Sequence, residues 1–176
     1  MLLGSGVCNA DPINDNVDLM VGADSVTGTI QTDGTIGVLS AADITGWNLE
    51  LTGFDGGITG VPISSNLTNF NSGVFAGGSA LTATASDLYF DFSATDGSYL
   101  DFQVSFASGT YYYIDCSTGG SICAQGATVT PRLNDSLVNT AVSGDQIIAS
   151  VPEPASLALL AAGWLGVVAK RRRIRA

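Results

Sequence analysis

The sequence contains no histidine, and only six of its 176 residues are lysine or arginine. Histidine is the commonest general base and metal ligand among side chains. Its absence excludes a Ser-His-Asp or Cys-His catalytic arrangement and a histidine-bearing zinc site. No lysine precedes Lys170, which excludes lysine-based covalent catalysis from the first 169 residues. The chain also lacks a phosphate-binding loop of the Gly-x-x-x-x-Gly-Lys type and a dinucleotide-binding glycine motif.

Charged residues are scarce, at 12% of the chain, and they are segregated by sign. All sixteen acidic residues lie at or before Glu153, whereas five of the six basic residues lie between Lys170 and Arg175. The sixth basic residue is Arg132. An acidic surface repels nucleic acid and anionic lipid, because both bind basic faces. We therefore expect no nucleic-acid partner.

Three cysteines are present, and two of them are spaced like the ends of a hairpin. Cys116 and Cys123 flank a segment that contains Ser117-Thr118-Gly119-Gly120-Ser121. In an oxidising compartment this spacing predicts a disulfide, which a short loop makes worth about 2–3 kcal/mol. The alternative is a pair of free thiols in a turn.

Residues 1–10 are predicted to be the remnant of a secretory signal peptide. The segment ends in a small residue, with Cys8 and Ala10 at the −3 and −1 positions of a cleavage site. A charged n-region and most of an apolar h-region are missing, so we expect the true start to lie upstream. Lipidation of Cys8 is the alternative, although Val7 is larger than the residue that usually precedes a lipidated cysteine.

Residues 11–150 are predicted to form one exported all-β domain, an antiparallel β-sandwich or jelly-roll-like fold. Apolar and polar residues alternate in 44–52, 88–92 and 100–106, as half-buried strands require. Asp96-Gly97 predicts a turn that joins the last two segments into a central hairpin. Turns are also predicted at 33–34, 55–57 and 75–78. Weaker strand candidates are 16–21, 25–32, 35–39, 63–69, 80–84, 110–115, 127–131 and 146–149.

Carboxylates are the remaining candidates for chemistry in this domain. Glycoside hydrolysis needs two acids across a cleft, and Glu50, Asp91 and Asp101 project from predicted strands. Solvated outward positions explain them more simply, so a carboxylate-based glycoside hydrolase is the least favoured function. We predict no metal or other cofactor. The alternative is a loose calcium site made by turn aspartates: Asp33, Asp55 and Asp96.

Tyr111-Tyr112-Tyr113 is a run of three aromatic residues in a predicted strand. The period of two puts Tyr111 and Tyr113 on one face and Tyr112 on the other. An exposed tyrosine pair can stack on sugar rings, which makes a carbohydrate-binding module the alternative function. Cross-strand aromatic packing is the simpler interpretation.

The end of the chain consists of three consecutive segments that predict membrane attachment. Val151, Pro152, Glu153 and Pro154 should be extended, because proline fixes its own φ and restricts the residue before it. The apolar run 155–169 predicts a transmembrane helix of about 22 Å, which is short for a bilayer. Its anchoring residues are Ala155, Leu157, Leu159, Leu160, Trp164, Leu165, Val167 and Val168.

The segment 170–176 is basic and is predicted to be the cytoplasmic tail, which leaves the β domain outside the cytoplasm. Its basic residues are Lys170, Arg171, Arg172, Arg173 and Arg175. Their long stems can reach the bilayer surface and compensate in part for the short span. We therefore expect membrane lipid to be a partner of the C-terminal helix.

The order Pro-Glu-Pro, short apolar run and terminal basic cluster resembles the PEP-CTERM protein-sorting domain of Gram-negative bacteria. The resemblance covers 151–175 only. It implies recognition and cleavage at Pro152-Glu153-Pro154 by an exosortase, a polytopic membrane enzyme with a cysteine nucleophile. It also implies a secreted or surface-displayed structural or interaction protein, linked to exopolysaccharide and biofilm production. It implies no enzymatic activity for the β domain.

Overall fold

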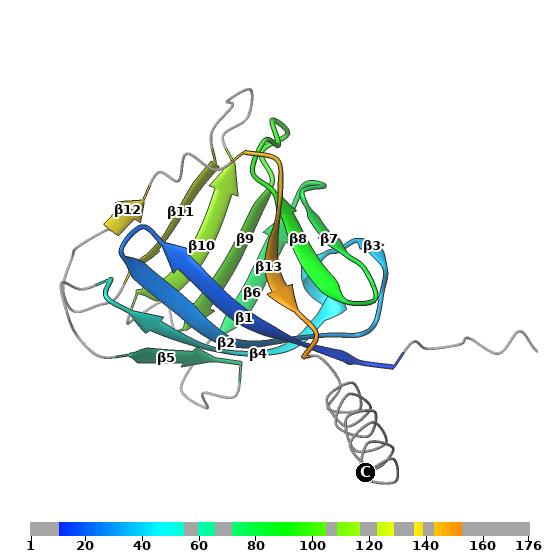
Figure 1. Cartoon of the computed structure of the whole chain (residues 1–176), viewed down its shortest axis with the longest axis horizontal. Coiled ribbons are helices and arrows are strands. Elements are labelled where there is room, and N and C mark those ends of the chain that lie inside the picture. Colours follow the sequence, from blue (N-terminus) through cyan, green and yellow to red (C-terminus); the bar gives the residue numbers. More distant parts are fainter. Residues whose placement is uncertain are drawn as a thin grey trace, which may run out of the picture.

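The computed structural model describes residues 11–54, 60–65, 72–104, 109–116, 123–128, 136–138 and 143–152 (Figure 1). The predicted signal-peptide remnant, Asp55 and the segment 153–176 lie outside these residues. The described elements are β1 (Ile13–Val21), β2 (Asp24–Thr32), β3 (Gly37–Val38), the 3-10 helix η1 (Ala41–Asp43), β4 (Ile44–Thr52), β5 (Val61–Ser64), β6 (Gly73–Gly77), β7 (Leu81–Ala83), β8 (Asp87–Asp91), β9 (Tyr99–Val104), β10 (Thr110–Cys116), β11 (Cys123–Thr128), β12 (Ser136–Val138) and β13 (Asp145–Ser150).

The described strands form two antiparallel sheets, which confirms the all-β prediction (Figure 1). The eight-stranded sheet has the order β3-β7-β8-β13-β1-β2-β4-β5. The five-stranded sheet has the order β12-β11-β10-β9-β6. Strands β9 to β12 lie side by side in sequence order, whereas in the other sheet β13 inserts between β8 and β1. The arrangement is sandwich-like, and jelly-roll connectivity stays a prediction.

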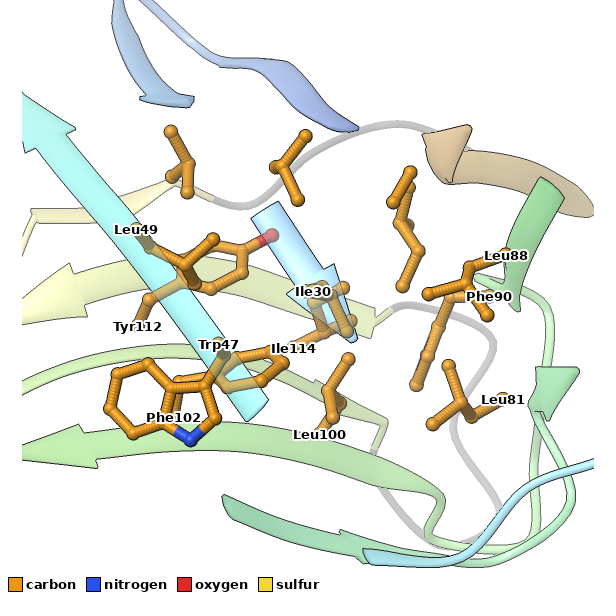
Figure 2. Close-up of a cluster of buried hydrophobic side chains, with 14 of the residues drawn as sticks. Ile30, Trp47, Leu49, Leu81, Leu88, Phe90, Leu100, Phe102, Tyr112 and Ile114 are labelled. Atoms are coloured by element: carbon orange, nitrogen blue, oxygen red, sulfur yellow. The ribbon is translucent and has the colours of Figure 1, made fainter. Parts of the chain in front are cut away.

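One hydrophobic core fills the space between the two sheets (Figure 2). Trp47 of β4 and Phe102 of β9 meet edge to face across it, with ring centroids 5.4 Å apart. Phe102 in turn stacks on Tyr112 of β10 at 6.3 Å. Burying a side chain of this size contributes about 1.5–3 kcal/mol relative to leaving it in water. The core therefore holds the two sheets together.

Strand β4 shows how the sequence pattern determines which face of the sheet is buried. Trp47, Leu49 and Leu51 are buried, whereas Asn48 and the other polar residues between them are exposed. The sequence predicts this alternation, and the structure confirms it. A period of two places every second side chain on the same face, so the inner face of β4 is entirely apolar over this stretch.

The predicted central hairpin of 88–92 and 100–106 is wrong. Strand β8 pairs with β7 and β13 in the eight-stranded sheet, whereas β9 pairs with β6 and β10 in the five-stranded sheet. The connection 93–98 crosses from one sheet to the other. The two segments therefore bury their apolar faces in the same core from opposite sides. Alternation reports that a face is buried, but it does not report which strand lies beside it.

Residues 75–78 were predicted to form a turn, but most of them belong to β6, an edge strand of the five-stranded sheet. The glycines of the segment suggested a turn because glycine weakens strands. In the structure Gly77 has a packing role instead. A Cβ added at this position would lie 2.6 Å from Cε1 of Tyr99, whose ring covers the glycine.

Candidate functional site

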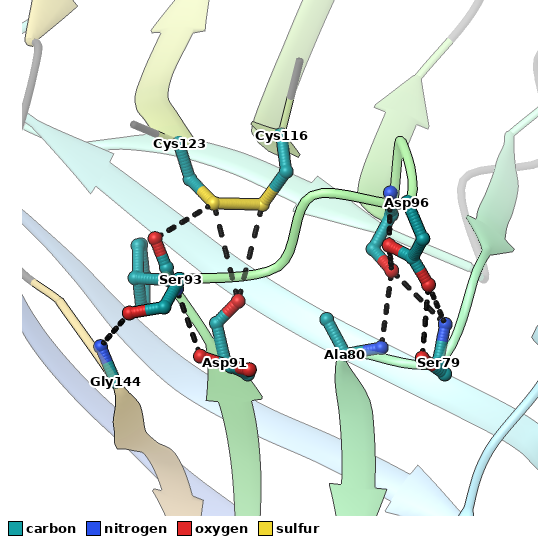
Figure 3. The surroundings of a disulfide bond; sticks show 10 residues. Ser79, Ala80, Asp91, Ser93, Asp96, Cys116, Cys123 and Gly144 are labelled. Carbon is teal, nitrogen blue, oxygen red and sulfur yellow. Dashed lines mark hydrogen bonds between the residues drawn. A yellow bond between two sulfur atoms is a disulfide. The ribbon is translucent and has the colours of Figure 1, made fainter. Parts of the chain in front are cut away.

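The predicted disulfide is confirmed and closes one end of the β10–β11 hairpin (Figure 3). Cys116 and Cys123 are register partners with Cα atoms 4.0 Å apart, and both are almost fully buried. Sγ of Cys123 lies 3.1 Å from the carbonyl oxygen of Phe92. The disulfide therefore links two strands of the five-stranded sheet and packs against the start of the 93–98 crossover.

A polar cluster fixes the other end of the same crossover (Figure 3). The Asp96 carboxylate accepts hydrogen bonds from the backbone N–H and hydroxyl of Ser79, at 3.0 and 2.9 Å. The buried Ser98 hydroxyl donates to Asp96 and accepts from the N–H groups of Ser79 and Ala80. Hydrogen bonds from Ser98 and Ser79 lower the pKa of Asp96 to about 2. This aspartate therefore stabilises the connection between the sheets.

The turn aspartates proposed for calcium have other partners in the structure. Asp96 is bound as described, and Asp33 accepts a hydrogen bond from the N–H of Thr35 at 2.9 Å. Asp55 lies outside the described residues. Within the described ranges, no group of three or more Asp, Glu or Cys side chains is placed to hold a metal ion. Calcium binding stays a prediction without support from these residues.

The three candidate catalytic carboxylates are not brought together. Glu50 and Asp101 project from the outer faces of opposite sheets, so the core separates them. Asp91 ends β8, and one of its carboxylate oxygens accepts a hydrogen bond from the N–H of Ser93. Glycoside hydrolysis requires two carboxyl groups across one cleft, and Glu50 and Asp101 cannot supply such a pair.

The tyrosine run behaves as its alternation predicted. Tyr112 is 2% exposed and belongs to the core, whereas Tyr111 and Tyr113 project from the outer face of the five-stranded sheet. The rings of Tyr111 and Tyr113 are tilted against each other, with centroids 5.7 Å apart. Asp101 of β9 is the register partner of Tyr113. The structure thus brings one predicted catalytic candidate beside the predicted sugar-binding pair.

These residues line a hollow of about 440 Å³ on the outer face, which we call the aromatic hollow. Its lining residues are Tyr99, Asp101, Tyr111, Tyr113, Ile114 and Asp115. Sequence reasoning missed Tyr99 and Asp115 as members of a site. Both hold outward positions of strands whose pattern was recognised, but only the β9–β10 register shows that they are partners.

Strand β6 extends the same face beyond the hollow. Phe75 is the register partner of Asp101 on the side opposite Tyr113, and 42% of its surface is exposed. The ring of Tyr99 lies over Gly77, where any side chain would displace it. An aromatic surface therefore surrounds Asp101 on β6, β9 and β10.

The carboxylate of Asp101 is unusual among the acidic groups of the described residues. Its Oδ1 is buried and has no hydrogen-bond partner within the part of the chain that the structure describes. Burial raises the pKa of Asp101 to about 6, because desolvation disfavours the charged form. A buried acceptor without a donor is costly, so a cation that binds beside this carboxylate would be favoured.

The predicted sorting segment begins at the end of a central strand. Ser150 ends β13 and pairs with Asn16 of β1 and Asp87 of β8. The N–H of Val151 then donates to the carbonyl oxygen of Ser86 at 2.7 Å. Pro152 is exposed and is the last residue described. The folded domain therefore continues up to the residue before Pro152.

The predicted anchor 155–169 and basic tail 170–176 lie outside the described residues. Among the residues that are described, no helix has the length and apolar character needed to cross a membrane. The transmembrane helix and its topology therefore stay predictions.

Comparison with known proteins identifies one segment of the chain. The family model of the PEP-CTERM protein-sorting motif matches residues 150–173, as the resemblance of this segment implied. No curated protein and no solved structure matches the chain. The motif implies processing by an exosortase, with export and cell-surface sorting in Gram-negative bacteria. The chain thus carries, in its C-terminal segment, a match to the PEP-CTERM sorting motif.

Proposed function

We propose that the chain is a non-enzymatic component of an exopolysaccharide or biofilm matrix, displayed at the cell surface after exosortase processing. The observation that carries this proposal is the position of the sorting motif, which follows the last strand of the folded domain without a linker. Cleavage at or after Pro152 would leave β13 in place between β8 and β1. The processed product would therefore keep the complete eight-stranded sheet.

Each part of the C-terminal segment has a separate role in this proposal. The helix 155–169 holds the exported domain at the membrane until processing, with the basic residues of 170–176 on the cytoplasmic side. The prolines keep the chain extended at the cleavage region, and an extended strand is the shape in which proteases usually bind substrates. A short span suits a temporary anchor better than a permanent one.

Replacement of Pro152, Glu153 and Pro154 by alanine in the native host tests the sorting proposal. The expected result is loss of tail removal, so that a C-terminal epitope tag stays on the full-length protein in the membrane fraction. Asn48→Ala, on the exposed face of β4, is the matched control and should be processed normally. Unchanged removal of the tail from the triple variant would contradict recognition through this motif.

A second role is favoured by the aromatic hollow: the β domain binds carbohydrate. Aromatic side chains with a few polar groups are typical of small-ligand sites, and Tyr111 and Tyr113 offer ring faces beside the acceptor of Asp101. Binding of the full chain, in detergent, to a panel of polysaccharides tests this role. Retention on at least one neutral or basic polysaccharide, reduced by Tyr111→Ala, is expected. No retention on any polysaccharide would contradict it.

A further inference from the structure

The aromatic hollow combines three features that together indicate the charge of its ligand. It is concave, it presents aromatic rings, and it is lined by the carboxylate of Asp101, whose buried Oδ1 has no donor among the described residues. We infer that it binds an amino sugar with a free ammonium group, as a unit of a saccharide chain. This inference rests on the proposed carbohydrate binding and names the ligand within that class.

The polar groups of the hollow favour a cation. Asp101 and Asp115 both line it, on neighbouring strands, and no lysine or arginine is among the described residues that line it. The first 154 residues contain only one basic residue, Arg132, which lies outside the described ranges. An ammonium group donates three hydrogen bonds and carries the opposite charge. It would pair with the carboxylates of Asp101 and Asp115 that line the hollow.

The aromatic groups favour the same ligand. Tyr99, Tyr111 and Tyr113 line the hollow, and Phe75 lies across Asp101 on β6. The faces of such rings attract cations and also cover the apolar faces of sugar rings. A sugar that carries an ammonium group can make both contacts, one through its charge and one through its ring. A metal ion has no ring to stack on the tyrosines and would not fill the hollow.

The same charges disfavour acidic saccharides. A uronic acid would place a third carboxylate beside Asp101 and Asp115, and like charges in a partly desolvated site repel each other. An N-acetylated sugar keeps its ring and one N–H donor but has no charge. Comparison of these three saccharides therefore separates ring stacking from recognition of the ammonium group.

The test uses the full chain in detergent and isothermal titration with three hexamers of matched length. They are a glucosamine hexamer, an N-acetylglucosamine hexamer and a galacturonic acid hexamer. The glucosamine hexamer is expected to bind at least about tenfold more tightly than the acetylated one, as a charge-assisted hydrogen bond implies. The galacturonic acid hexamer is expected not to bind. Salt should weaken only the glucosamine complex.

Two variants show whether binding takes place in the hollow. Asp101→Asn should lower the affinity for the glucosamine hexamer by about 10–100-fold and change the affinity for the acetylated hexamer little. Asp18→Asn removes the same charge from an exposed position on β1, in the other sheet. It should leave both affinities unchanged. An equal loss of affinity for the glucosamine hexamer in the two variants would mean that the acidic protein attracts the cationic saccharide in general. That result would overturn the inference.

The outcomes distinguish the inference from the proposal on which it rests. If the acetylated hexamer binds as tightly as the glucosamine hexamer, carbohydrate binding stands and recognition of the ammonium group is overturned. If none of the three hexamers binds to the unmodified chain, this inference is overturned. The wider polysaccharide panel described above then decides separately whether the β domain binds carbohydrate at all.

Discussion

The two outer faces of the sandwich differ in chemistry, although both sheets alternate between buried and outward side chains. The eight-stranded sheet presents on β1, β2 and β4 mainly small polar residues: Asn14, Asn16, Asp18, Ser25, Thr27, Thr29, Gln31, Asn48, Glu50 and Thr52. The five-stranded sheet presents on β6, β9 and β10 mainly aromatic residues with carboxylates: Phe75, Tyr99, Asp101, Tyr111, Tyr113 and Asp115.

This difference separates the residues that stabilise the fold from those that are available for binding. The inner faces of both sheets supply the core, so the outward rings add nothing to the contact between sheets. The outer face of the eight-stranded sheet has no aromatic side chain on β1, β2 and β4, although Met20 of β1 and Ile147 of β13 are exposed. The other sheet differs in that its outward side chains are mainly aromatic rings beside carboxylates, and we propose that ligand binding explains this grouping.

The largest effect is expected from a change in the core that both faces share. Trp47→Ala should lower the free energy of unfolding by about 3–5 kcal/mol, because the indole contacts Phe102 across the two sheets. Tyr111→Ala, on the outer face, should lower it by less than about 1 kcal/mol. Urea denaturation followed by tyrosine fluorescence and circular dichroism measures both variants. Similar losses would mean that the outer rings also stabilise the fold.

The disulfide should have the next largest effect. Replacing Cys116 and Cys123 together by alanine should cost about 2–3 kcal/mol, as expected for a short loop. Hydrogen exchange should then show faster opening of β10 and β11 than of β1 and β2. Equal acceleration in both sheets would contradict a local role for the disulfide in the five-stranded sheet.

Two carboxyl groups with raised pKa values, one in each sheet, should determine how stability changes with pH near neutrality. Burial, with a smaller effect from the charge of Asp87, raises the pKa of Asp15 to about 6, and burial alone does the same for Asp101. Since folding raises both pKa values, their favourable contribution is complete below about pH 4 and is lost as the pH rises through 6. Folding lowers the pKa of Asp96 to about 2, so its favourable contribution is present above about pH 4 and changes little between pH 5 and pH 8.

The free energy of unfolding should therefore fall between pH 5 and pH 8, by on the order of 1–2 kcal/mol for each carboxyl group. The melting temperature should fall with it. Asp101→Asn should remove its part of the decrease, and Asp15→Asn should remove the other part. Asp18→Asn, at an exposed position, serves as the control and should leave the pH dependence unchanged. A melting temperature that rises over this range would contradict the raised pKa values.

The smallest effect on stability is expected at Gly77. Gly77→Ala should displace the Tyr99 ring from its position beside the hollow, because the new Cβ would lie 2.6 Å from Cε1. Saccharide binding should weaken, while the melting temperature should change by only a few degrees at most, since the ring is at the surface. Gly46→Ala is the control, because its Cβ would meet Gln31 at an ordinary distance of 3.4 Å on the other sheet.

The sequence predicted features that depend on neighbouring residues in the chain. The alternation of β4, the opposite directions of Tyr111 and Tyr112, and the disulfide between Cys116 and Cys123 all follow from short-range pattern and spacing. The sorting segment was recognised for the same reason, because its signals are consecutive. These predictions needed no knowledge of how the strands pair.

The sequence could not predict features that depend on pairing between strands. The segments 88–92 and 100–106 both alternate well, yet they enter different sheets. The glycines of β6 suggested a turn, and this prediction was wrong. Gly77 makes room for the ring of Tyr99, a contact that depends on the pairing of β6 with β9. The position of Asp101 beside Tyr113 depends on the β9–β10 register, and a shift of one residue would turn every side chain to the other face.

We propose that saccharide binds the outer face of the five-stranded sheet and not that of the eight-stranded sheet. Backbone amide chemical shifts of the full chain in detergent micelles, recorded during titration with the glucosamine hexamer, distinguish the two faces. The predicted result is that shifts concentrate in β6, β9 and β10, around Asp101 and Tyr113, while β1, β2 and β4 stay unchanged. Shifts concentrated in β1, β2 and β4 would contradict the claim.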